Sequence, residues 1–175
     1  GRFLSGVYIN GMDLSGKTVD EVRAQLETNE TYALSNINIT LASEEINATI
    51  SGADMNASSN LNAVIEQALS GGPNQVYYTT ISIDETALTN RINAINQTSS
   101  KPPVEPAVVL DFTQSGPTYT EGQAGFGLDV QSTIALVKTA IESGQLQTTL
   151  SPVLTTIQPT QTLEEVKAHT AEIGR

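Results

Sequence analysis

The chain repeats one local pattern four times: a short run of β-forming residues, a turn that contains Asp, and an amphipathic helix. In the first copy, "GVYINGMDLSGKTVDEVRAQLE", residues 7–9 predict a strand and residues 11–16 predict the turn. Thr18 then predicts a helix N-cap, and Glu21 three residues later completes a capping box. The apolar stripe of this helix is Val19, Val22 and Leu26.

The other three copies follow the same order. Their acidic turn residues are Asp54, Asp84 and Asp129, and we expect the last two to cap the helices that follow. Glycines at 71 and 72 predict the end of the second helix. The helical spacing predicts these inward residues: Leu61, Val64, Ile65 and Leu69; Leu88, Ile92 and Ile95; Ile134, Val137 and Ile141.

Further strands lie between these helices. We predict one hairpin from residues 37–43 and 45–51, and a second from residues 106–113 and 117–123 with its turn at 114–116. Residues 148–159 predict a strand that Pro152 interrupts, so it is bent or lies at a sheet edge. A last helix is predicted to begin near residue 162.

This mixture lacks a regular βαβ alternation and therefore predicts an α+β fold, with repeated strand–turn–helix units, antiparallel hairpins and two packed subdomains. The breaks are "SGGPN" at 70–74 and the proline-rich "QTSSKPPVEP" at 97–106. We predict an N-terminal subdomain over 1–74, a second over 75–160, and a linker helix beginning at 161–175 that leads to a further domain.

The charge excludes some partners. The net charge is −11, and the eight basic residues are scattered singly along the chain. Nucleic acid needs clustered Lys and Arg for its phosphates, and anionic lipid surfaces need the same. We therefore expect no nucleic-acid partner and no direct membrane contact. Because no stretch approaches about 18 apolar residues, we also predict no membrane span.

Few residues here could carry chemistry. There is no Cys, which excludes disulfides, thiol catalysis and thiolate metal sites, and the single His169 lies near the C-terminal end on a predicted surface helix. Glu44 and Glu45 predict a hairpin tip rather than a calcium site, since the Asp-rich spacing of such a site is missing. We expect no metal and no cofactor.

Paired carboxylates cut glycosidic bonds, and the candidates for such a pair are Asp111, Glu121 and Asp129. The simpler interpretation makes Asp129 a helix cap and leaves the other two as solvated hairpin residues. The Gly-rich "GQAGFG" at 122–127 lacks the Lys and Ser/Thr of a phosphate loop. Its glycines predict tight backbone turns, with Phe126 packed over the helix that follows. We predict no catalytic residues.

The opening "VYINGMDLSGKTVDEVRAQLE" resembles the entry motif of VanW-like bacterial surface proteins. Residues 37–159 are similar to the peptidoglycan-binding domain of those proteins, which also precedes the catalytic domain of some L,D-transpeptidases. The segments that carry this resemblance are "NAVIEQALSGGPN", "ISIDETALTNRI", "KPPVEPAVVLDFTQSGPTYTEGQAGFGLDV" and "TTLSPVLTTIQPTQT".

The resemblance implies an α+β module outside the membrane of a Gram-positive-type bacterium, in a surface protein whose anchor or export signal lies upstream of this segment. It implies peptidoglycan, or its stem peptides, as the partner. Sugar faces stack on aromatic rings and extended peptides add to sheet edges. The candidate platform is Tyr77, Tyr78, Tyr119 and Phe126, and the expected ligand-binding residues are Tyr119, Glu121, Gln123 and Phe126.

Three functions follow from these observations. The first is a non-catalytic module that contacts peptidoglycan near residues 119–129. The second is a rigid spacer or stalk that presents a downstream domain and has no ligand of its own. The third is an enzyme whose carboxylates act on wall glycan.

Overall fold

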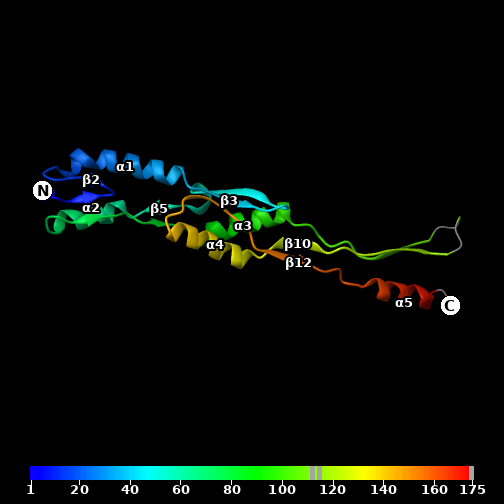
Figure 1. Cartoon of the computed structure of the whole chain (residues 1–175). Coiled ribbons are helices and arrows are strands. Elements are labelled where there is room, and N and C mark those ends of the chain that lie inside the picture. Colours follow the sequence, from blue (N-terminus) through cyan, green and yellow to red (C-terminus); the bar gives the residue numbers. More distant parts are fainter. Residues whose placement is uncertain (111–112, 114–115, 174–175) are drawn as a thin grey trace. The chain divides into compact units, whose positions relative to one another are not determined.

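The computed structural model describes residues 1–110, 113 and 116–173. Over these residues the fold is α+β, as expected from the sequence, and Figure 1 traces its elements in chain order. The α-helices are α1 (Val19–Ser35), α2 (Leu61–Ser70), α3 (Glu85–Ser99), α4 (Val130–Glu142) and α5 (Leu163–Ile173), with a 3-10 turn at Ala53–Met55.

Two sheets have three strands each. In the first, β1 (Tyr8–Ile9) lies between the antiparallel β2 (Met12–Asp13) and the parallel β6 (Val76–Tyr77). In the second, β3 (Asn38–Ala42) lies between the antiparallel β4 (Asn47–Ser51) and the parallel β11 (Gln147–Leu150). Each sheet therefore joins a local hairpin to a strand from a distant part of the chain.

The remaining strands form antiparallel pairs. These pairs are β5 (Ser58–Ser59) with β7 (Ile81–Ser82), β8 (Ala107–Val109) with β9 (Thr118–Thr120), and β10 (Gly125–Leu128) with β12 (Leu154–Ile157). The hairpins predicted at residues 37–51 and 106–123 are confirmed as β3–β4 and β8–β9. Residues 111 and 112 of the predicted strand and residues 114 and 115 of the predicted turn lie outside the described residues.

Pro152 separates two strands, as its position predicted. β11 ends at Leu150 and pairs with β3, whereas β12 begins at Leu154 and pairs with β10. β11 also lies at the edge of its sheet, in the order β11–β3–β4. Proline has no N–H for a sheet ladder, so the chain leaves one sheet before it and enters another after it.

The chain divides into two compact units, and neither is continuous in sequence. Unit 1 is Gly1–Arg91 with Ile134–Ser151, and unit 2 is Ile92–Thr133 with Pro152–Arg175. The sequence predicts separate subdomains with boundaries at residues 74 and 160, and this division stays a prediction.

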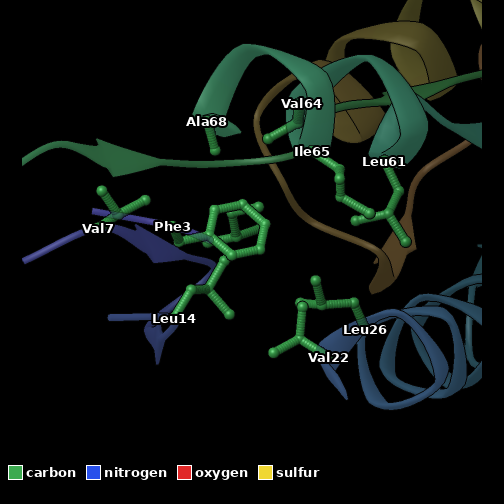
Figure 2. Close-up of a cluster of buried hydrophobic side chains, with 10 residues drawn as sticks. Phe3, Val7, Leu14, Val22, Leu26, Leu61, Val64, Ile65 and Ala68 are labelled. Carbon is green, nitrogen blue, oxygen red and sulfur yellow. The ribbon is translucent and has the colours of Figure 1, made fainter. Parts of the chain in front are cut away.

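Part of the core of unit 1 is built by its N-terminal strands and first two helices. Phe3, Val7 and Leu14 meet Val22 and Leu26 of α1, as Figure 2 shows, and all five are at most 2% exposed. The α2 side chains that close this cluster are Leu61, Val64, Ile65 and Ala68. The predicted stripes of α1 and α2 thus face one another across the N-terminal strands, with Val19 and Leu69 partly buried at the cluster.

The predicted helix caps are confirmed. The Thr18 hydroxyl accepts from the Glu21 N–H at 3.3 Å, and the Glu21 carboxylate accepts from the Thr18 N–H at 3.1 Å. The carboxylate of Asp84 accepts from the N–H groups of Thr86 and Ala87, and that of Asp129 accepts from Ser132 N–H at 3.1 Å. Gly71 caps the C-terminus of α2.

Two turns differ from the sequence prediction. The first turn does not span residues 11–16, because Asn10 and Gly11 make a two-residue hairpin between β1 and β2 with φ of 49° and 81°. Asn-Gly favours this left-handed geometry. The second difference is Gly125, which lies in extended strand β10 rather than in a tight turn.

Candidate functional site

Two of the three candidate catalytic carboxylates lie in the described part of the chain. Asp129 caps α4, as its position before "VQSTIALV" predicted, and Glu121 is exposed to solvent. Asp111 lies outside the described residues. His169 is exposed on α5. In the described ranges, no group of three His, Cys, Asp or Glu side chains gathers as a metal ion would require.

Tyr119 is half-buried on β9, where it pairs with Val108 of β8. The Lys167 ammonium of α5 lies 5.4 Å from the centre of the Tyr119 ring. A cation at this distance is attracted to the face of an aromatic ring, so it occupies one of the two faces on which a sugar would stack. This contact could not be predicted from local sequence patterns, because 48 residues separate the two side chains along the chain.

The other predicted ligand-binding residues follow Tyr119 along one ladder. Gln123 exchanges both backbone hydrogen bonds with Val104, at 2.8 and 2.9 Å, and its side chain is exposed. Phe126 exchanges both with Lys101, at 2.9 Å each, and is half-buried. The structure therefore places these residues in succession beside residues 101–108 rather than drawing them into one cluster.

The two remaining candidate aromatics lie in unit 1. Tyr77 is half-buried and packs against the N-terminal core, whereas its neighbour Tyr78 is 71% exposed. This is the alternation of a strand, in which one of two successive side chains faces inward.

A different surface of unit 1 is hollowed. Three shallow, open hollows, with volumes between about 490 and 580 Å³, lie along the C-terminal half of α1. Each of Tyr32, Ser35, Asn36 and Gln147 lines two of the three. Together their linings comprise α1 positions between 24 and 35, residues 36–38, Ser51 and residues 144–148. We call this surface the Tyr32 groove.

The helix itself sets the orientation of the groove. Ala24, Thr28, Thr31 and Ser35 recur every three or four residues, so they share one face of α1. The buried residues Val22, Leu26 and Glu30 follow the same spacing on another face. Tyr32 is 71% exposed at the groove, where it lines two of the three hollows.

The groove is almost without charge, and its lining combines apolar surface with hydroxyl and amide groups. Among its lining residues Glu27 is the one charged side chain, and its carboxylate lies 3.5 Å from the guanidinium of Arg23. On a chain of net charge −11, this is a nearly neutral surface that offers hydroxyl and amide groups beside apolar contact area. Such a surface suits a ligand that is itself rich in hydroxyls and amides.

Two side-chain amides in the groove have unused hydrogen-bonding capacity. Asn36 donates from Nδ2 to the Tyr32 carbonyl at 2.7 Å, which satisfies a carbonyl at the end of α1. Throughout the described chain, neither Asn36 Oδ1 nor the Gln147 side-chain amide has a hydrogen-bond partner. Both groups are partly or fully exposed and can bind a polar ligand beside Tyr32.

The chain matches the family model described as "Putative peptidoglycan binding domain" over residues 30–150. The chain belongs to this family. The match begins near the C-terminal half of α1 and ends with β11, so it includes Tyr32, Asn36 and Gln147. The peptidoglycan-binding match thus covers most of the groove as well as the predicted residues Tyr119 and Phe126.

Two solved structures are similar to this family member. One is an L,D-transpeptidase of Enterococcus faecium with a C442S substitution, at 14% identity and a TM-score of 0.40, covering 80% of this chain and 48% of that chain. The other, described as the Ldtfm-avibactam carbamoyl enzyme, also has 14% identity and a TM-score of 0.40, and covers 79% and 47%. The chain spans about half the length of these proteins. No curated protein matches it.

Sequence reasoning missed the Tyr32 groove. Part of the groove lies in "TNETYALSNINIT", whose composition is typical of a solvated polar surface. Composition alone assigns no role to any single residue of this stretch. One signal was available, since Tyr32 lies off the apolar stripe of α1. The other wall, residues 144–148, is more than 100 residues away and is placed by the parallel pairing of β11 with β3.

No helix in the described part of the chain combines the length and apolar character that crossing a membrane requires.

Proposed function

We propose that this chain is a non-catalytic module that binds peptidoglycan through the Tyr32 groove. The observation that carries the proposal is the 71% exposed Tyr32 in a nearly neutral, amide-lined groove inside the segment that matches the family. Tyr is enriched among residues that dominate binding energies, because its ring adds contact area at a small entropic cost.

Charge supports this choice of surface. Peptidoglycan carries carboxylates on its stem peptides, and the chain as a whole is strongly acidic. Like charges brought together on binding cost free energy, so a binding surface on such a chain should be the part with little net charge. The Tyr32 groove meets this condition.

The residues expected from the sequence remain a second proposed contact. Tyr119, Glu121, Gln123 and Phe126 lie in succession along the ladder of unit 2, and the ring of Tyr119 has one face beside Lys167. A glycan lying along this ladder would meet them one after another. We give them a supporting role, because Tyr119 is half-buried whereas Tyr32 is open.

We also propose that the module acts outside the cell, in a VanW-like surface protein of a Gram-positive-type bacterium that is anchored upstream of residue 1. The support is the resemblance of the opening motif and the family to which residues 30–150 belong. Localisation of the native full-length protein by cell fractionation tests this context, and a cytoplasmic protein would contradict it.

A pull-down on purified sacculi tests the binding. Tyr32→Ala should weaken the affinity for sacculi about five- to tenfold, since a binding Tyr contributes more than about 1 kcal/mol and 1.4 kcal/mol is a factor of ten in Kd. Tyr78→Ala is the matched control, because Tyr78 is also 71% exposed in unit 1 and is not in the groove, so it should bind like wild type. Tyr119→Ala should show a smaller loss.

Two outcomes would contradict the proposal. If wild type is no more enriched on sacculi than an unrelated acidic protein, the spacer function replaces binding. If dye-labelled sacculi are solubilised by wild type but not by Glu121→Gln, the module is an enzyme. A loss with Tyr119→Ala but none with Tyr32→Ala would transfer the site to unit 2.

A further inference from the structure

We propose that the outer edge of β11 binds an extended stem peptide of peptidoglycan as an added strand. This inference rests on the proposed function and names the part of the polymer that the groove recognises. Extended peptides commonly bind by pairing with an exposed sheet edge, where main-chain hydrogen bonds supply affinity and neighbouring pockets supply specificity.

The hydrogen bonds of β3 show which groups of β11 face outward. Asn38 N–H donates to the Leu146 carbonyl at 2.8 Å, and the register pairs Thr148 with Ile39 and Leu150 with Leu41. Alternate residues of a strand direct their N–H and C=O groups to the same neighbour. Residues 146, 148 and 150 therefore bond to β3, and the N–H and C=O groups of Gln147 and Thr149 point to the outer edge.

The opposite edge of the same sheet is blocked. On β4, the carbonyl of Thr49 faces away from β3, and the guanidinium of Arg91 donates to it from Nε at 3.3 Å and from Nη2 at 2.8 Å. Asp54 holds Arg91 in place with a carboxylate oxygen 3.5 Å from Nε. Arg91 belongs to α3, and covering an edge strand with a helix prevents further pairing, whereas in the described chain no side chain bonds to the outer edge of β11.

The open edge continues into the Tyr32 groove. Gln147 and Thr148 line the hollow that also contains Tyr32 and Asn36. A strand added to β11 would therefore place some of its side chains against Tyr32 and the free amide of Gln147. Gln147 belongs to both features, since its main chain faces the edge and its side chain lines the groove.

Length and charge define the ligand class. Two outward residues offer two N–H and two C=O groups, which is the pairing capacity of a peptide of about three to five residues. The groove residues beside the edge, 144–148, are uncharged, so the carboxylates of a stem peptide meet no acidic side chain among them. A short, amide-rich peptide is the ligand that these observations favour.

Amide hydrogen exchange on the full chain tests the edge directly. In the free protein the N–H groups of Gln147 and Thr149 should exchange fast and those of Thr148 and Leu150 slowly. A saturating synthetic stem peptide should slow exchange at Gln147 and Thr149 at least tenfold. An oligomer of N-acetylglucosamine without peptide should leave both rates unchanged.

One variant removes the proposed contact without touching the β3 ladder. Thr149→Pro deletes an outward N–H only, and proline is tolerated on an edge strand at such a position. It should weaken stem-peptide binding at least fivefold with an unchanged circular-dichroism spectrum. Thr149→Val keeps the N–H and loses the hydroxyl, so it should bind like wild type. If Thr149→Pro does not fold, the exchange experiment decides alone.

The outcomes separate this inference from the proposed function. If sacculi are bound but the stem peptide is not, or if the peptide binds without slowing exchange at Gln147 and Thr149, the edge proposal fails and the module still binds peptidoglycan. If neither binds, both proposals fail. Protection of these amides without peptide, together with a dimer in light scattering, would show that a second copy occupies the edge and would overturn the inference.

Discussion

At the scale of single residues, Asn10 holds three segments of unit 1 together. Its Nδ2 donates to Glu30 Oε1 and to Thr79 Oγ1, each at 2.9 Å, and its Oδ1 accepts from Thr79 N–H at 3.0 Å. Thr79 Oγ1 donates in turn to Glu30 Oε1 at 2.6 Å. Glu30 is only 9% exposed, so a carboxylate on the inner side of α1 is held by neutral donors.

Two substitutions of Asn10 distinguish the contribution of its side-chain hydrogen bonds to stability from the contribution of its backbone conformation. Asn10→Gly keeps the left-handed φ accessible but removes the donors to Glu30, and we expect a loss of about 1–3 kcal/mol in the free energy of unfolding. Asn10→Ala should cost about 1 kcal/mol more, because a Cβ strains a residue at positive φ. Urea unfolding measures both, and equal stability of Asn10→Gly and wild type would contradict the role of the network.

The residues whose roles could be predicted from the sequence are those whose hydrogen-bond partners are close along the chain. Thr18, Asp84 and Asp129 cap helices through partners within three residues, which is why a short pattern identifies them. The dipeptide Asn10–Gly11 is also a local hairpin signal, so the turn predicted at 11–16 is wrong for a reason that the sequence contains. Buried Glu30 could not be predicted, since its partner Thr79 lies 49 residues away along the chain.

At the scale of elements, Gly125 allows a close approach between two backbones. A Cβ built on Gly125 would collide with the main chain of Lys101, Pro102 and Pro103, which cannot move aside as a flexible side chain can. This approach lets Phe126 exchange both hydrogen bonds with Lys101. The glycine therefore fixes β10 beside residues 101–104 by its lack of a side chain.

Gly125→Ala and Gly127→Ala form a matched pair within β10. At Gly127 the nearest atom to a new Cβ is Asn96 Oδ1 at 3.3 Å, a side-chain atom that can shift by a few tenths of an ångström. We expect Gly125→Ala to lower the free energy of unfolding by more than about 2 kcal/mol, as overpacking does, and Gly127→Ala by less than half as much. Thermal unfolding measures the two losses, and a reversed order would refute the backbone contact.

Elements with a long periodic pattern were predictable and short ones were not. The helices were recognised from their stripes and caps, and the two hairpins were recognised because their strands are adjacent in sequence. The parallel pairs β1–β6 and β3–β11 were missed, since strands of two to five residues carry little pattern and their partners lie far along the chain. The pairing of β3 with β11 places one wall of the Tyr32 groove, so the groove could not be predicted from local sequence patterns.

At the scale of the whole molecule, the chain leaves unit 1 after Arg91 and returns to it at Ile134. The returning segment supplies the β11 strand and the buried Ile134, Val137 and Ile141. Unit 1 is therefore built from two segments that are separated by 42 residues of the chain.

Truncation tests this discontinuity. A chain that ends at residue 133 should lose cooperative unfolding of unit 1, because burial of three large aliphatic side chains contributes about 5 kcal/mol or more, against a typical domain stability of about 5–15 kcal/mol. A chain that ends at residue 151 keeps the whole of unit 1 and should retain slow amide exchange in β3. If both truncated chains protect β3 equally, the returning segment is dispensable.

The guanidinium that covers β4 also sets a limit on self-association. A sheet with two open edges can pair with a further copy at each edge and grow into a fibre. A sheet with one blocked edge can pair with a single copy only. Arg91 should thus restrict association through the edges of this sheet to pairs of molecules.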